Sequence, residues 1–168
     1  MRLIIHDLKK EQADQFLPQD ENTKVIYQKS EIKPCRGCFG CWVRTPGKCV
    51  QTDGYEMMGE LFAQTEELVI VSRCVYGSFS PFVKMVLDRS LSYLLPDFQI
   101  IDGEMHHLRR YENQFRLRVL FYGEDITEWE KETAKNLVYA NAKNLNAQVE
   151  EIEFDPQDLG GLPCEELH

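Results

Sequence analysis

Four of the six cysteines lie close together, between positions 35 and 49. They form a C-x2-C-x2-C-x7-C pattern made by Cys35, Cys38, Cys41 and Cys49. Thiolates two residues apart can converge on one centre, which is how proteins hold soft metals and iron-sulfur clusters. The alternative is a tight, glycine-rich loop in which the thiols pack as small apolar groups. The spacing leaves both interpretations open.

Three segments together resemble a known family: CRGCFGCWVRTPGKCVQTDG, VSRCVYGSFSPFVKMVLDRS and FYGED before a long helix. They are similar to flavodoxin-like NAD(P)H-dependent FMN reductases, and in particular to the members whose Cys-rich loop is akin to that of iron-sulfur flavoproteins. The resemblance covers roughly residues 32–146. It implies an FMN-dependent oxidoreductase that takes electrons from NAD(P)H and reduces a small-molecule redox substrate. Related proteins often carry the cysteines without an obvious cluster, so we do not favour an iron-sulfur cluster and assign no metal.

The resemblance places FMN at the carboxyl ends of the first, third and fourth strands. The loop after the third strand would direct backbone N–H groups at the flavin ring and so stabilise its reduced form. Glu124 and its neighbours would form the opposite wall, with a glycine allowing close approach. No catalytic residue is assigned. The expected cofactor-binding residues are Cys74, Val75, Tyr76, Gly77, Ser78, Tyr122, Gly123 and Glu124.

The loop after the first strand departs from the family pattern. Relatives hold the FMN phosphate there with small and hydroxyl residues, whereas residues 7–16 contain no Gly, Ser or Thr. Asp7 and Glu11 would repel a phosphate, although Lys9 and Lys10 offset part of that charge. The phosphate loop is therefore degenerate. Two alternatives stay open, a flavin-free protein with an interaction or regulatory role and an iron-sulfur electron carrier.

Short β-branched runs alternate with helical patterns along the chain. Ser80 before Pro81 predicts a helix that runs to Pro96, and Thr127 with Glu130 predicts a second, capped helix. Asp53 with Glu56 resembles another capping box. The expected strands are residues 2–8, 23–28, 67–73, 115–122 and 148–154.

This alternation predicts a single α/β domain over residues 1–168. The expected architecture is a flavodoxin-like three-layer α/β/α sandwich with a five-stranded parallel sheet in the order 2-1-3-4-5. The first crossover, residues 9–22, is close to the minimum length, so its helix should be short. We therefore expect a homodimer in which a second copy covers the exposed face. Residues 97–113 have no clear pattern and are expected to form a lid or a partner surface.

Charge and hydropathy exclude several classes of partner. Asp and Glu (28) outnumber Lys and Arg (19), giving a net charge of −9, which disfavours nucleic acid and anionic lipid. No apolar run is long enough for a membrane helix, and the N-terminal apolar stretch is too short for a signal peptide. We expect a cytoplasmic protein.

Overall fold

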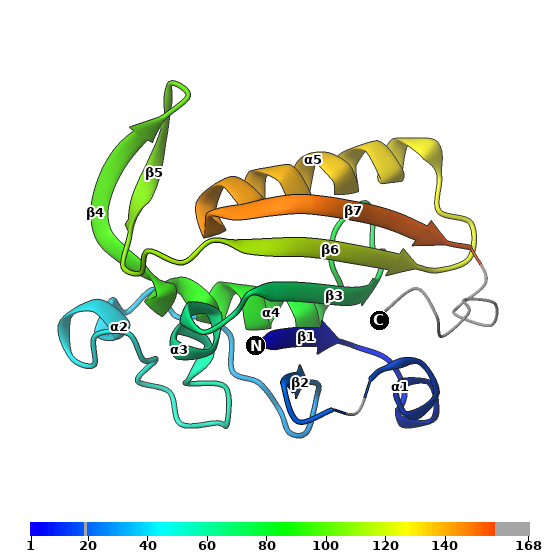
Figure 1. The fold of residues 1–168 in the computed structure, drawn as a ribbon, viewed down its shortest axis with the longest axis horizontal. Coiled ribbons are helices and arrows are strands. Elements are labelled where there is room, and N and C mark those ends of the chain that lie inside the picture. The colour runs from blue at the N-terminus through cyan, green and yellow to red at the C-terminus, as the bar shows by residue number, and fades with distance from the viewer. Residues whose placement is uncertain (19, 157–168) are drawn as a thin grey trace.

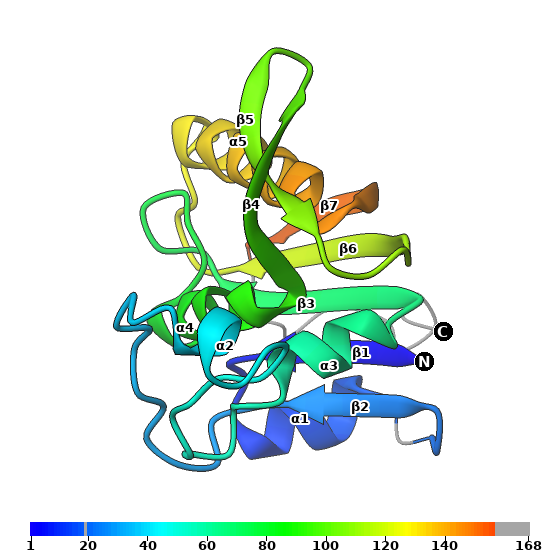
Figure 2. The ribbon, with the colours of Figure 1, turned by 90° about the vertical axis from the view of Figure 1, so that its left-hand side faces the viewer.

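The structure is a computed structural model that describes residues 1–18 and 20–156. Its parallel sheet contains β1 (Arg2–His6), β2 (Thr23–Ile26), β3 (Glu67–Arg73), β6 (Phe115–Tyr122) and β7 (Ala147–Asp155). The strands lie side by side in the order β2-β1-β3-β6-β7, from bottom to top in Figure 2. Counted within the sheet, this is the order 2-1-3-4-5. The predicted flavodoxin-like α/β fold is confirmed.

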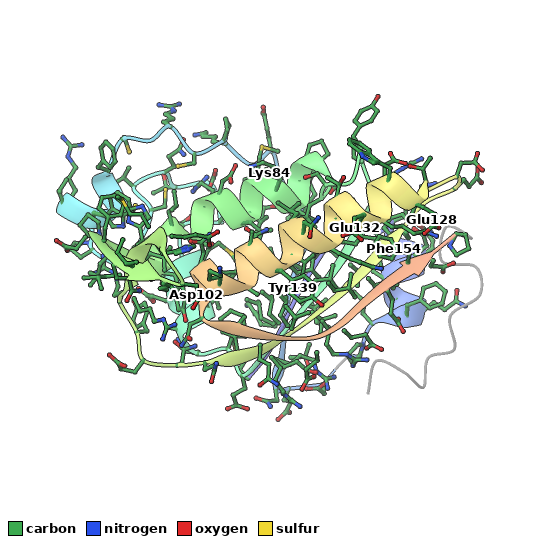
Figure 3. The ribbon with its side chains drawn as sticks, turned by 90° about the horizontal axis from the view of Figure 1, so that it is seen from above. Lys84, Asp102, Glu128, Glu132, Tyr139 and Phe154 are labelled. Carbon is green, nitrogen blue, oxygen red and sulfur yellow. The ribbon has the colours of Figure 1, made fainter. Side chains whose placement is uncertain are left out.

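Helices cover both faces of the sheet. On one face, α3 (Met58–Ala63), α4 (Pro81–Arg89) and α5 (Glu128–Leu145) enclose the larger core. Seen from above, α4 and α5 lie on the same side of the sheet, with Lys84 labelled on α4 and Tyr139 on α5 (Figure 3). On the other face, α1 (Lys10–Phe16) packs over a smaller core. The odd and even positions of the strands supply the two cores, as expected of a sheet buried on both sides.

The caps of α4 and α5 form as predicted. The Ser80 hydroxyl accepts a hydrogen bond from the Val83 N–H, and Pro81 occupies the first turn. At α5 the Thr127 hydroxyl accepts from the Glu130 N–H, while the Glu130 carboxylate accepts from the Thr127 N–H. These local contacts satisfy amides that the helix itself leaves without partners.

The prediction that the α4 helix reaches Pro96 is wrong. The helix ends at Arg89, a 3₁₀ turn η1 (Ser90–Tyr93) follows, and Leu94 already belongs to β4 (Leu94–Ile101). Tyr93 turns inward, is 1% exposed and packs against Phe62. The apolar residues after Arg89 therefore fill the core through a bend, and the proline that follows disfavours helix at the residue before it.

The insertion at residues 97–113, which has no clear pattern in the sequence, is mostly a hairpin. Strands β4 and β5 (Glu104–Arg109) pair in antiparallel fashion and project from the sheet (Figure 1). Asp102 and Gly103 form the turn, with φ values of 51° and 83°. An Asp-Gly pair with two positive φ angles is a preferred two-residue hairpin turn, so this dipeptide was the signal in the sequence.

The first crossover helix is short, as predicted: α1 has seven residues and, among the described helices, is the one that packs on the smaller core. The homodimer expected from this thin cover stays a prediction. Light scattering of the purified protein should give the mass of two chains. A mass of one chain across the micromolar range would contradict it.

Candidate functional site at the carboxyl edge of the sheet

Loops from three strands meet at the carboxyl edge of the sheet. Asp7 follows β1, and its carboxylate accepts hydrogen bonds from the Arg73 N–H at the end of β3, at 3.1 and 3.2 Å. The Cys74 N–H donates to the Tyr122 carbonyl at the end of β6, at 2.9 Å. In a sheet of this topology, ligands bind where the strand order reverses, and β1 and β3 flank that point here.

Asp7 occupies the centre of this edge. Beside the Arg73 amide, its carboxylate accepts hydrogen bonds from the Ser80 and Tyr122 side chains. Burial raises the pKa of Asp7, and these hydrogen bonds lower it in part. A carboxylate held in this way leaves little room for an anion. The sequence flagged Asp7 as a repelling charge, but its partners on β3 and β6 become visible only in the fold.

The loop after β3 is a tight turn whose amides are largely bonded within it. Val75 and Ser78 exchange N–H···O bonds of 2.9 and 3.0 Å, and the Gly77 N–H bonds the Cys74 thiol. Gly77 lies against α5: a side chain there would come within 2.7 Å of Thr133. Tyr76 stands at the tip of the turn, 85% exposed, with φ at 52°. Three of the amides expected to face a flavin are therefore directed into the turn.

The loop after β6 places a buried glycine, Gly123, at the end of the strand. Gly123 has φ at 147°, and a side chain placed there would meet nothing closer than 3.8 Å. Its N–H donates to the Asp155 carbonyl at 3.1 Å, which fixes the loop on β7. Tyr122 is buried, whereas Glu124 is exposed. The close approach of a flavin expected at Gly123 stays a prediction.

The structure does not bring the four clustered cysteines to this edge. The short helix α2 (Gly40–Val43), which carries Cys41, lies near the hairpin, at the end where β3 and β6 begin, whereas α1 lies at the opposite end (Figure 1). The Trp42 indole N–H donates to the carbonyls of Leu91 and Leu94, at 3.3 and 3.0 Å. Trp42 therefore anchors the Cys-rich loop beside η1.

The cysteine loop itself holds reduced thiols. Cys35 and Cys38 are exposed, and Cys41 and Cys49 are half-buried, all without disulfides. Burial raises the pKa of Cys41, and the three neighbouring thiols raise it further. Among the described residues, no three His, Cys, Asp or Glu side chains are grouped as a metal site. The iron-sulfur alternative therefore gains no support from the geometry of residues 1–18 and 20–156.

A buried ion pair fixes this loop to α4. Arg89 is fully buried and bonds both Asp53 oxygens, at 2.7 and 2.9 Å. Its guanidinium also donates to the carbonyls of Lys33 and Gln51, at 2.8 and 3.1 Å. Asp53 is thus a partner of Arg89 and does not cap α3, whose capping residue is Met57. The capping box predicted at Asp53 and Glu56 is wrong because the buried cation takes the carboxylate.

An exposed ion pair lies on the surface of α4. The Lys84 ammonium lies 2.9 Å from the Asp88 carboxylate, one helical turn away, and both side chains are about half exposed. Such exposed pairs contribute little to stability. The two neighbouring basic residues of α4, Lys84 and Arg89, therefore have different roles.

Comparison with solved structures shows the fold. Trp repressor binding protein from Bacillus subtilis is 12% identical with a TM-score of 0.55, and the match covers 98% of this chain and 90% of that one. An azoreductase from Bacillus anthracis str. Sterne is 12% identical at 0.55, covering 94% and 87%. An NADPH-quinone reductase from P. pentosaceus is 10% identical at 0.54, covering 92% and 83%. No family model matches the chain, and no curated protein matches it in sequence. The chain shares the fold of these proteins.

No described helix is both long enough and apolar enough to cross a membrane.

Proposed function

We propose that this protein is a flavin-binding oxidoreductase of the NAD(P)H-dependent FMN reductase type. Its site would bind the flavin ring and sugar chain without specific contacts to the phosphate. The observation that carries the proposal is the meeting of the loops after β1, β3 and β6 around the Asp7 carboxylate. The names of similarly folded proteins, an azoreductase and an NADPH-quinone reductase, support a reductive chemistry.

The residues present fit the ring and sugar chain of a flavin but not its phosphate. The exposed Tyr76 side chain, at the tip of the turn after β3, is free to cover a flat ring. The Asp7 carboxylate can accept hydrogen bonds from ribityl hydroxyls, whereas it repels a phosphate. The helix α1 has only seven residues and begins without a hydroxyl side chain or a glycine, so it provides few hydrogen-bond donors for the phosphate.

A bound flavin would accept a hydride and pass the two electrons on to a small acceptor molecule. The chain's part is to orient the ring and exclude water from it. Asp7 holds the three loops together through its hydrogen bonds. The Cys74–Ser78 turn packs against α5 through Gly77, and this contact fixes the position of Tyr76 at the tip of the turn. NAD(P)H as the electron donor belongs to the same proposal.

The experiment is a titration of the purified protein with riboflavin and with FMN, followed by flavin fluorescence. Riboflavin should bind at least as tightly as FMN because Asp7 opposes the phosphate. Asp7→Asn should strengthen FMN binding about tenfold and leave riboflavin within about threefold, since charges near 4 Å interact by about 1–4 kcal/mol at protein surfaces. Asp88→Asn is the matched control on α4 and should change neither.

A strong preference of the wild-type protein for FMN would show that the phosphate is held elsewhere. The second candidate function, a flavin-free interaction protein, is favoured by one observation: the turn after β3 bonds its own amides. It predicts that neither flavin changes its fluorescence on addition of protein. The iron-sulfur alternative predicts brown protein that releases acid-labile sulfide.

A further inference from the structure

A cavity of about 530 Å³ opens between α1 and the carboxyl ends of β1 and β2. It exists because α1 is too short to cover this part of the sheet. Ala13 and Leu17 from the α1 segment and Val25 from β2 give it an apolar lining. Its volume lies within the range of about 300–1,000 Å³ that is typical of small-molecule sites. Its walls come from β1, α1 and β2, whereas the flavin loops after β3 and β6 contribute none of its lining residues.

The side chain of His6, in the cavity wall, has a hydrogen-bond donor that no described residue accepts. His6 is 2% exposed, and its Nδ1 accepts the Leu8 N–H at 3.1 Å. Burial lowers the pKa of His6 to about 4, so the ring is neutral and its proton is on Nε2. The described part of the chain provides no acceptor for that Nε2–H. Nε2 is not one of the fully buried polar atoms that lack a partner among the described residues, so an acceptor in the cavity can reach this donor and bond it.

The geometry around His6 favours a flat ligand. Its ring stacks on Tyr27, with centroids 5.8 Å apart and planes inclined by 16°. An acceptor atom in line with Nε2–H lies in the plane of the imidazole. A flat ligand that carries this atom and is coplanar with the imidazole would therefore be nearly parallel to the Tyr27 ring. Tyr27 is 43% exposed, and its ring also lines the cavity. An aromatic molecule therefore matches the shape of this wall better than a branched aliphatic one.

The charges of the lining residues cancel, and Lys29, which is not a lining residue, holds its ammonium 4.9 Å from the Tyr27 ring centroid. Lys9 and Lys10 contribute two positive charges, and Asp7 and Asp14 contribute two negative ones. An anion would meet both carboxylates, and a cation would meet both ammonium groups. With an apolar lining and no net charge, the cavity suits a neutral molecule.

We propose that this cavity binds a neutral, planar N-heteroaromatic molecule of one or two rings, whose ring nitrogen accepts a hydrogen bond from His6 Nε2. The cavity shares Asp7 with the proposed flavin site but uses neither the loop after β3 nor the loop after β6, and the ligand proposed here goes beyond the proposed function. It would give the protein a second small-molecule ligand on the face of the sheet that α1 covers.

The test uses two soluble probes of the same shape, 6-hydroxyquinoline and 2-naphthol, which differ by one ring nitrogen. Each is titrated at pH 7 into the full-length protein without flavin, and binding is followed by the NMR signals of the probe. The quinoline should bind about threefold to tenfold more tightly, the value of one neutral hydrogen bond. An anionic probe, 2-naphthoate, should bind no better than 2-naphthol.

Substitutions separate the hydrogen bond from the cavity. His6→Phe keeps an aromatic ring but loses the donor, so the preference for the quinoline should disappear while 2-naphthol stays within about twofold. His6→Asn retains an acceptor for the Leu8 N–H and serves if the first variant misfolds. Ala13→Leu should fill the cavity and weaken both probes, whereas Tyr139→Leu, on α5, should affect neither.

Two results would overturn the proposal: equal binding of the two bicyclic probes to the wild-type protein, or a quinoline preference that persists in both His6 variants. Absence of binding up to the solubility of the probes would overturn it as well. Because no flavin is present in the assay, the outcome is independent of the flavin titration.

Discussion

Replacing Arg89 with Met should lower the free energy of unfolding by about 3–5 kcal/mol, the usual cost of leaving one charge of a buried pair without its partner. Arg89 is 0% exposed and Asp53 4% exposed at the side chain. Met retains most of the side-chain volume, so the loss reports the charge and its hydrogen bonds more than a void. Urea unfolding followed by far-ultraviolet circular dichroism measures it.

The matched control is Lys84→Met on the same helix, which breaks an exposed pair and should cost less than about 1 kcal/mol. The double variant Asp53→Asn with Arg89→Met removes both charges and should regain part of the lost stability. A loss below about 1 kcal/mol in Arg89→Met would mean that the pair is not buried as described.

The same pair predicts a response to acid. Burial alone would raise the pKa of Asp53, but hydrogen bonds from Arg89 and from the amides of Lys33 and Tyr55 lower it to about 2. A carboxyl whose pKa is lowered on folding adds stability above its unfolded value near 4, and that stability is lost as the pH falls toward 2. In Arg89→Met this loss below pH 4 should be reduced.

The second large effect is the pH dependence produced by His6. Its pKa falls from the 6.5 of an unstructured chain to about 4 in the folded protein, because burial disfavours the charged ring. The unfolded chain therefore takes up the proton first as the pH falls. Stability should decrease from pH 6.5 to pH 4 by about 3 kcal/mol through this residue and level off below pH 4.

Asp7 acts in the opposite direction. Burial raises its pKa, so its protonation in the folded state adds stability as the pH falls through that raised value. The contribution of His6 is therefore best isolated by a variant. In His6→Asn the urea midpoint should depend less on pH between 4 and 6.5. Identical pH profiles for the wild type and His6→Asn would contradict the assignment.

The parallel sheet and its strand order could be predicted from the order of residues along the chain. Alternating β-branched runs and helical stretches allow few topologies, because crossover connections between parallel strands are right-handed and short. The caps at Ser80 and Thr127 could be predicted because each depends on residues three or four positions apart. The short first helix could be predicted because the crossover at residues 9–22 is close to the minimum length for a helical connection. The degenerate phosphate loop, expected from the types of residue at positions 7–16, stays a prediction.

Contacts between distant residues could not be predicted in this way, because they depend on how the elements pack. Asp53 looked like a helix cap until Arg89, 36 residues later, took its carboxylate. Asp7 looked like a loop charge until the fold placed it against β3 and β6, 66 residues from Arg73. The cysteine cluster could be read from spacing, but its place at the far end of the sheet from α1 could not. Local patterns specify elements, whereas a buried charge takes whichever partner the packed chain brings within hydrogen-bond distance, and that partner is set by topology.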